Sequence, residues 1–155
     1  MKFTYQAYAN LIHLLRQEGY VFTDYHQYPS VKAERMVILR HDIDDDIEKA
    51  VQMARLEYQL DCHSTYFVLI SSDIYNPFSK KNGAFLQEIL SLGHSVGLHF
   101  DEVRYGKDCD IVQKIQEEID ILEKYIQRKV TSVSMHRPSR KTLDSNYCIQ
   151  GGGSE

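Results

Sequence analysis

Residues 36–46 read MVILRHDIDDD, an apolar run that ends abruptly in charged side chains. The four consecutive apolar residues Met36 to Leu39 predict a strand that is buried on both faces, as a parallel sheet requires. In folds that alternate strands and helices, the loops at the carboxyl ends of the strands form the active face. The charged residues 40–46 therefore fall where such a fold would place a functional site.

The aspartates of this stretch also suit a second role. Asp44 to Asp46 precede a segment of helical spacing that begins near Ile47, and an acidic side chain there would complement the positive end of a helix. One aspartate is sufficient for that role. We interpret the charged side chains that are not needed for the helix start as a candidate site: Arg40, His41, Asp42 and Asp44.

The composition is that of one globular domain. The chain has 155 residues, of which 43% are hydrophobic and 26% charged, so it is long enough to bury its own core. A formal net charge of -4 provides no basic field for nucleic acid or for an anionic membrane surface. The N-terminus lacks a continuous apolar segment, and no stretch approaches the length of a membrane span. We expect neither nucleic-acid binding nor membrane insertion; the oligomeric state stays open.

The cysteines indicate the compartment. Cys62, Cys109 and Cys148 are odd in number and far apart, so they predict neither a disulfide framework nor a thiolate zinc site. A reducing environment fits this usage best. We therefore expect a cytoplasmic protein.

Helical and strand patterns alternate along the rest of the chain. Apolar spacing predicts helices between Thr4 and Gly19 and over 47–60, 83–92 and 111–126, and β-branched or aromatic runs predict strands over 64–70, 95–100 and 130–135. Residues 20–32 are aromatic and polar, and they predict a loop. The first strand–helix–strand unit, which ends with the strand over 64–70, has the length of a right-handed crossover, so the sequence predicts an α/β fold with a parallel sheet.

Four such β/α units make an incomplete barrel. An open sheet of four strands would leave an edge unpaired, so we expect the chain to be the amino-terminal part of a longer barrel. We assign residues 1–140 to a single α/β domain. Residues 141–155 are polar, end in GGGSE, and predict a tail or linker.

Three of the four predicted strands end in a side chain that can bind a metal. Asp42 or Asp44 follows the first strand, and His99 and His136 stand at the ends of the third and fourth. Strand ends converge on one face of a parallel sheet, so these distant residues are expected to meet. One carboxylate and two imidazoles suit zinc best, although iron, cobalt, nickel or manganese would also accept them. The competing interpretation is that isolated polar residues simply cap the strand ends.

A zinc ion with three protein ligands keeps a position for water and favours hydrolysis of an amide or ester. The aspartate that does not bind the metal would act as general base or orient one. Arg137 or Arg40 would hold that carboxylate or stabilise a developing oxyanion, although each is equally explained as an ion-pair partner. Tyr75 and Asn76, in the loop 71–82 after the second strand, are candidates for substrate binding, and so is Arg40.

The motifs HDID, STYFV, GHSVGLHFD and SVSMHRP follow one another in this order between about Val37 and Pro138. In order and spacing they resemble the polysaccharide deacetylase superfamily (NodB homology, carbohydrate esterase family 4), and most closely its branch with an RHD-x-D motif. The resemblance implies an incomplete (β/α) barrel, a divalent metal held by one aspartate and two histidines, and removal of acetyl groups from sugars. It also makes the first aspartates base and ligand, His99 a ligand, and His136-Arg137-Pro138 the counterpart of the arginine-proline motif.

Two motifs depart from the family pattern. The family places two aspartates side by side, whereas Ile43 separates Asp42 from Asp44; we assign Asp44 to the metal and Asp42 to the base. The family's second motif ends in another histidine, and here that position holds Val103, so His136 is expected to supply the missing ligand.

Three functions follow as hypotheses. The first is a metal-dependent carbohydrate deacetylase that acts on the N- or O-acetyl groups of a saccharide or sugar intermediate, in carbohydrate metabolism. The second is a degenerate, non-catalytic domain that binds a saccharide or a partner chain, which Val103 and the absent later strands suggest. The third is another metal hydrolase on the same scaffold, such as a phosphoesterase, because ligands alone do not name the bond that is broken.

Overall fold

The computed structural model describes residues 4–106 and 109–145. Within them, helices and strands alternate for most of the chain. In chain order the elements are α1 (Tyr5–Gln17), β1 (Val21–Thr23), the 3-10 helix η1 (Tyr28–Ser30), β2 (Met36–Ile43), α2 (Ile47–Gln59), β3 (Ser64–Leu69), α3 (Lys80–Ser91), β4 (Ser95–Asp101), the 3-10 helix η2 (Glu102–Tyr105), α4 (Ile111–Ile126), β5 (Val133–His136) and α5 (Arg140–Leu143).

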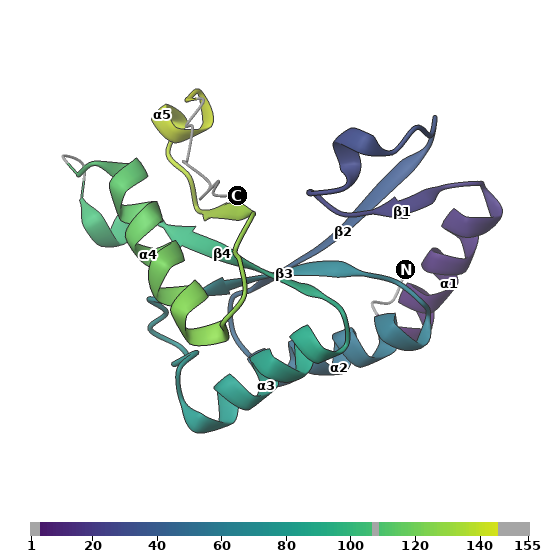
Figure 1. Ribbon diagram of the computed structural model, residues 1–155, viewed down its shortest axis with the longest axis horizontal. Helices are drawn as coiled ribbons and strands as arrows, with labels where there is room; N and C mark the ends of the chain where they lie inside the picture. The colour runs from purple at the N-terminus through teal and green to yellow at the C-terminus, as the bar shows by residue number, and fades with distance from the viewer. Residues whose placement is uncertain (1–3, 107–108, 146–155) are drawn as a thin grey trace.

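The strands of the described residues form one parallel sheet in the order β1-β2-β3-β4-β5. Spatial order and chain order agree, so every crossover advances the chain by one strand in the same direction. Right-handed crossovers then put the connecting helices on a single face, and the sheet curls around the other. The result is part of a β/α barrel, with β1 and β5 as its two edges (Figure 1). The predicted α/β fold, an incomplete barrel, is confirmed.

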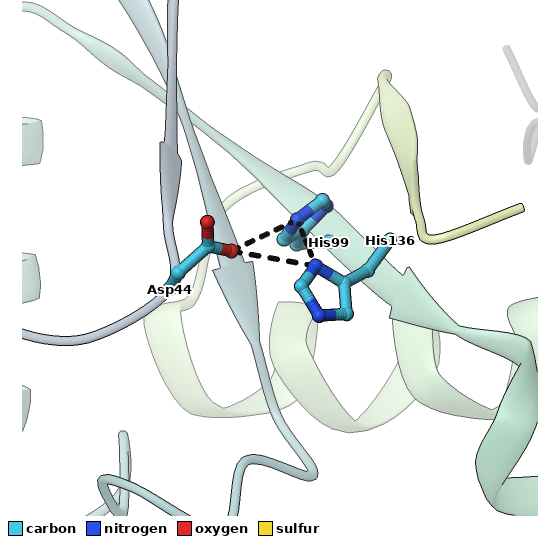
Figure 2. Close-up of side chains that lie close together, drawn as sticks. All are labelled: Asp44, His99 and His136. Carbon is cyan, nitrogen blue, oxygen red and sulfur yellow. Dashed lines mark hydrogen bonds and ion pairs between the residues drawn. The ribbon is translucent and has the colours of Figure 1, made fainter.

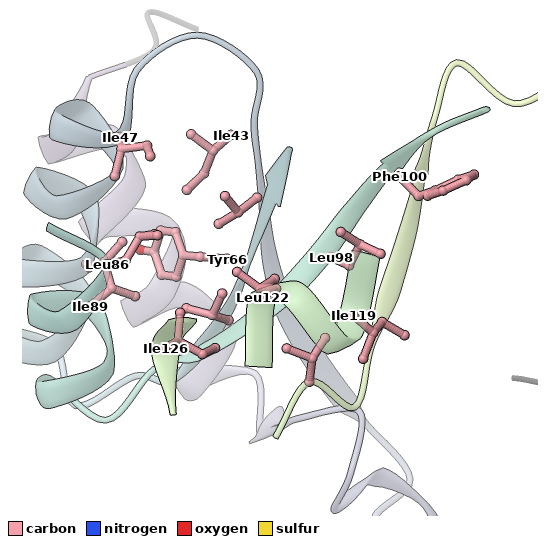
Figure 3. Packing of buried hydrophobic residues seen from close by; sticks show 14 of the residues in the cluster. Ile43, Ile47, Tyr66, Leu86, Ile89, Leu98, Phe100, Ile119, Leu122 and Ile126 are labelled. Carbon is pink, nitrogen blue, oxygen red and sulfur yellow. The ribbon is translucent and has the colours of Figure 1, made fainter. Parts of the chain in front are cut away.

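The main core lies between the sheet and helices α2, α3 and α4 (Figure 3). Tyr66, Leu98, Ile89 and Leu122 have no solvent-exposed surface. Burying an apolar side chain of this size stabilises a fold by roughly 1.5–3 kcal/mol. The helical spacing that predicted α2 corresponds to residues of this core, because Ile47, Val51 and Ala54 are all buried.

Side chains on the strands alternate between this core and the concave face of the sheet. On β2 the side chain of Ile43 belongs to the core, so that of Asp42 is on the concave face. The register places Phe67 beside Asp42 and Gly97 beside Phe67. A Cβ atom on Gly97 would lie 2.6 Å from the Phe67 ring, so the absence of a side chain there makes room for the phenyl group. The register also places His99 beside Ser134, and Asp101 beside His136.

The helices begin where the sequence supplies a capping side chain. Asp46 accepts a hydrogen bond from the Glu48 N–H at the start of α2, as expected for one of the three consecutive aspartates. Ser79 caps α3 in the same way by accepting from the Asn82 N–H. This cap starts α3 at Lys80, three residues before the predicted start, because its first turn is polar and lacks the apolar spacing used for the prediction.

Three further predictions differ from the structure. The predicted loop 20–32 contains β1, which has only three residues and therefore shows no recognisable periodicity. Met36 to Leu39 are half-buried instead of buried on both faces, since only this short strand borders β2 on that side. The last strand begins at Val133 and not at Val130; the Val130 N–H instead donates to a carboxylate oxygen of Glu123.

Other expectations concern the chain as a whole. Helix α5 spans the predicted boundary at residue 140, while residues 146–155 of the predicted tail lie outside the described residues. Cys62 and Cys109 are free thiols, and Cys148 lies outside the described residues. None of the described helices combines the length and the apolar character that a membrane crossing needs.

Candidate metal centre

Three predicted ligands converge at the carboxyl ends of the strands. Asp44 directly follows β2, His99 lies in β4 and His136 ends β5, and their side chains point toward one another (Figure 2). His99 Nε2 lies 3.3 Å from Asp44 Oδ1, and His136 Nδ1 lies 3.4 Å from the same oxygen. The two imidazole nitrogens are 3.0 Å apart. Residues separated by more than ninety positions in the chain thus form one compact donor set.

These distances fit a single cation. A tetrahedral zinc ion with nitrogen and oxygen ligands at about 2.0–2.2 Å separates neighbouring ligand atoms by roughly 3.3–3.6 Å. An octahedral ion at the same bond lengths separates adjacent ligands by about 2.8–3.1 Å. The observed 3.0–3.4 Å lies across these ranges, so the three atoms can occupy one face of either coordination shell.

The hydrogen bonds of His99 orient its free nitrogen toward the site. His99 Nδ1 lies 3.0 Å from the carbonyl oxygen of Ser134, which can only accept, so Nδ1 carries the proton. The lone pair of Nε2 is then directed at Asp44 and His136. A backbone carbonyl that fixes the tautomer in this way is typical of metal-binding histidines.

Solvent reaches the centre from one side. The side chain of His99 is 3% exposed, that of His136 is 21% exposed and that of Asp44 is 52% exposed. The imidazole of His99 therefore forms the buried base of the donor set, and the carboxylate forms its outer rim. An ion on these ligands would keep coordination positions that water or a substrate oxygen can enter.

Asp42 lies outside this group of three and has a different partner. One guanidinium nitrogen of Arg40 lies 2.6 Å and 2.7 Å from the two carboxylate oxygens of Asp42. The same nitrogen donates to Ser134 Oγ, and the guanidinium lies 4.8 Å from the centre of the Phe67 ring. Of the two predicted arginines, Arg40 is therefore the one that holds Asp42.

Ser134 is a site residue that the sequence reasoning missed. Its hydroxyl accepts from Arg40 and its carbonyl accepts from His99, so one buried residue joins the candidate base to a candidate ligand. The available signal was its position two residues before His136, which puts both side chains on the same face of a strand.

Arg137 pairs with a residue other than the one expected. Its guanidinium lies 2.7 Å from Asp101 Oδ2, and its side chain is largely exposed. Its φ angle is +50°, a left-handed conformation that turns the chain directly after His136. The described contacts therefore make Arg137 the partner of Asp101 at the end of β4.

Tyr75 and Asn76 are both engaged within the protein. The Tyr75 hydroxyl donates to the Ile43 carbonyl at 2.7 Å and accepts from the Leu69 N–H at 3.0 Å, which ties the ends of β2 and β3 together. Burial raises the pKa of this phenol. Asn76 Oδ1 accepts from the Phe78 N–H in a turn. Both residues also line a pocket of about 310 Å³, so a substrate role remains a prediction.

A second pocket adjoins Asp44. It has a volume of about 310 Å³ and lies between the end of β2 and the start of α2. Acidic residues 44–46 form part of its wall, together with Lys49, and the rings of His41 and Tyr66 contribute to its lining. The site therefore has space on the helix side of the loop.

No protein-family model matches the chain, and no curated protein matches it in sequence. Two solved structures are similar to it. The deacetylase PplD of Streptococcus pyogenes, in complex with acetate, has a TM-score of 0.68 at 15% identity, covering 90% of this chain and 66% of its own. IcaB from Ammonifex degensii has a TM-score of 0.65 at 14% identity, covering 91% of this chain and 70% of its own.

These similarities concern the fold. They confirm that the chain has the incomplete β/α barrel that we expected from the motifs, because both structures share this fold with it. The chain spans slightly less than two thirds of the length of PplD and slightly more than two thirds of the length of IcaB.

Proposed function

We propose that the chain belongs to a divalent-metal-dependent carbohydrate deacetylase, which removes N- or O-acetyl groups from a saccharide or sugar intermediate. The convergence of Asp44, His99 and His136 is the observation that carries this proposal. The order of the motifs supports it, as does the fold shared with a deacetylase that was found in complex with acetate. In this proposal the chain supplies the metal ligands and the general base.

The ligand set accounts for the metal dependence of the proposed reaction. A divalent cation at this position, most suitably zinc, would polarise the acetyl carbonyl and lower the pKa of a water molecule toward neutrality. Asp44, His99 and His136 would hold it, and the Ser134 carbonyl keeps the His99 imidazole in the required tautomer. The exposed rim at Asp44 gives a bulky saccharide access from solvent.

Asp42 is the proposed general base. Its carboxylate accepts a proton from the water that attacks the acetyl carbon, and the same proton is then delivered to the departing nitrogen or oxygen of the sugar. The bond between the acetyl carbon and that atom breaks, which leaves a free amine or hydroxyl group and acetic acid; the acid carries the second proton of the water and loses it to solvent or to the freed amine, giving acetate. Arg40 fixes the orientation of Asp42 throughout, because it contacts both carboxylate oxygens and is itself anchored to Ser134.

Metal content and acetate release test the proposal together. The purified chain, and the longer protein where it is available, are expected to contain one divalent ion by elemental analysis and to release acetate from acetylated glucosamine oligomers. His99→Ala and His136→Ala are expected to lose the ion, whereas the exposed His13 on α1 provides a control substitution that should retain it. Retention of the ion by both ligand variants would contradict the assignment.

The same assays separate the competing functions. Release of phosphate instead of acetate would indicate a phosphoesterase on this scaffold. A chain that binds saccharides without a metal would indicate a non-catalytic binding domain, in line with Val103 at the position of the family's second histidine. The cytoplasmic location remains a prediction from the cysteine usage.

A further inference from the structure

A buried carboxylate lies on the opposite face of β2 from the candidate base. Glu57 of α2 has no exposed surface and accepts hydrogen bonds from three elements. His41 Nε2 of β2 lies 2.8 Å from its Oε1, the Tyr66 hydroxyl of β3 lies 2.5 Å from its Oε2, and the Tyr8 hydroxyl of α1 also donates to Oε1. Glu57 therefore joins two neighbouring strands and two helices at one point.

Glu57 is ionised in the folded protein. Burial by itself would raise the pKa of this carboxyl, but the hydrogen bonds from His41, Tyr66 and Tyr8 and the charge of His41 outweigh burial and lower the pKa to about 2. A buried ion with its partners is a poor source of stability, because an apolar side chain of similar volume is often equally stabilising or better. General stability is therefore a weak explanation for this network, and a specific geometric role is a better one.

His41 is held from two directions. Its ring stacks on Tyr66, with centroids 4.8 Å apart and planes inclined by 27°, and Glu57 accepts its Nε2 proton. The neighbours of His41 in the chain, Arg40 and Asp42, point to the other face of β2. Fixing the His41 ring therefore fixes the rotation of β2 about its own axis, and with it the direction of both neighbours.

Asp44 depends on that rotation more than the other ligands do. Across residues 4–106 and 109–145, the groups within 4 Å that could pair with its carboxylate are the imidazoles of His99 and His136. The side chain of His99, in contrast, is buried and bound to the Ser134 carbonyl. The position of the Asp44 carboxylate is thus determined by the backbone at the end of β2, three residues after His41.

We propose that His41 and Glu57 are positioning residues for the metal centre: they clamp β2 from its helix side so that Asp44 faces the two histidines and Asp42 stands beside them. The inference rests on the proposed metal site. It adds to that site a pair, the partly exposed His41 and the fully buried Glu57, that acts through the orientation of β2.

Cobalt titration of the metal-free chain tests the proposal, because Co²⁺ accepts the same ligands as zinc and its visible absorption reports coordination geometry. The decisive comparison is His41→Phe with Tyr8→Phe. Each variant removes one hydrogen bond to Glu57 and keeps an aromatic ring, but only His41 lies on β2. We expect His41→Phe to weaken cobalt binding about tenfold or more, as loss of an outer-shell partner does, and to alter the absorption spectrum. Tyr8→Phe should lower the thermal midpoint without either effect.

His41→Gln provides the rescue, because its amide nitrogen can replace Nε2 as the donor to Glu57. Recovery of cobalt affinity to within a fewfold of the unmodified chain, even where His41→Phe folds poorly, would support positioning through this hydrogen bond. Unchanged cobalt affinity and spectrum in His41→Phe and in Glu57→Gln would overturn it, whatever happens to stability. If the unmodified chain binds no cobalt, both the proposed metal site and the positioning role are wrong. If the chain binds cobalt as expected but does not release acetate, the proposed deacetylase function is wrong and the positioning role still stands.

Discussion

Arg40 on β2 donates from one nitrogen both to Asp42 on the same strand and to Ser134 on β5. The guanidinium reaches across β3 and β4 to make the second contact, and it lies over the Phe67 ring of β3, 4.8 Å from the ring centre. Because the Ser134 carbonyl accepts from His99, the candidate base and a candidate ligand belong to one connected group. Arg40 and Arg137 therefore have different partners, although the sequence offered them as alternatives.

This difference predicts unequal effects of two arginine substitutions. Arg40→Ala is expected to lower kcat/KM for deacetylation by roughly 10²-fold or more, because Asp42 loses its orientation as general base. Arg137→Ala should lower it by less than about tenfold, since Arg137 pairs with Asp101 at the exposed rim. Acetate release measures both, and elemental analysis should find the metal retained in each variant. If Arg137→Ala lowers kcat/KM more than Arg40→Ala does, Arg137 is the arginine with the catalytic role.

A second prediction concerns the close approach of Gly97 and Phe67. In Gly97→Ala the new Cβ atom would lie 2.6 Å from the phenyl ring and 3.0 Å from the Ser132 carbonyl oxygen, so the ring must move. Overpacking of this kind costs about 1–3 kcal/mol of unfolding free energy, measured by urea denaturation. Displacing the ring also disturbs Arg40, which lies over it, so deacetylation should fall further than the stability loss explains.

Gly19→Ala is the matched control for Gly97→Ala. Its φ angle is +78°, and nothing lies within 4 Å of an added Cβ atom. That substitution should cost only the backbone strain of a left-handed alanine, about 1–2 kcal/mol, and leave activity unchanged. Equal effects of the two alanines on activity would contradict the packing argument.

The sequence predicted what depends on periodicity and on strand ends. The spacing of Ile47, Val51 and Ala54 gave α2, and apolar runs that stop at an ionisable residue gave the position of Asp44, His99 and His136. Those signals are local, because a helix stripe or a strand end is encoded within a few consecutive residues. Convergence of the ligands followed from the parallel sheet without knowledge of any contact.

The sequence could not predict which side chains support the site. Ser134 resembles any small polar strand residue, and Glu57 resembles the solvated charges of an ordinary helix, although it is fully buried. Their roles depend on partners 94 and 16 positions away. Strand β1 was missed for a related reason, since three residues make no pattern until β2 lies beside them.

Tyr75→Phe distinguishes a structural tyrosine from a substrate-binding one. Removing the hydroxyl leaves the Ile43 carbonyl and the Leu69 N–H without this shared partner, which costs about 1–3 kcal/mol of unfolding free energy. Chemical denaturation should detect this loss, while Asn76→Ala, in the exposed turn, should cost clearly less. If Tyr75→Phe instead raises KM strongly at unchanged stability, its hydroxyl contacts substrate.

The last prediction is a pH dependence of stability that belongs to Glu57. Its pKa is lowered to about 2 in the folded protein, below the ordinary value of 4.5, so its contribution is complete above pH 4.5 and is lost as the pH falls toward 2. The lowering corresponds to at most about 3 kcal/mol. Urea titrations between pH 2.5 and 7 measure the unfolding free energy of the unmodified chain and of Glu57→Gln. The difference between the two should shrink below pH 4.5.

Glu118 provides the control of opposite sign. It is 2% exposed, and its burial outweighs the hydrogen bonds from Tyr105 and Ser71, so its pKa is raised in the folded protein. A raised carboxyl pKa contributes stability at low pH that is lost as the pH rises above 4.5. The unfolding free energy of Glu118→Gln should therefore increase relative to that of the unmodified chain as the pH rises above 4.5. In the same pH range Glu57→Gln should be least stable relative to the unmodified chain. Parallel curves for the two variants would mean that net charge governs the pH dependence, and that His41 and its partners do not hold an ionised Glu57.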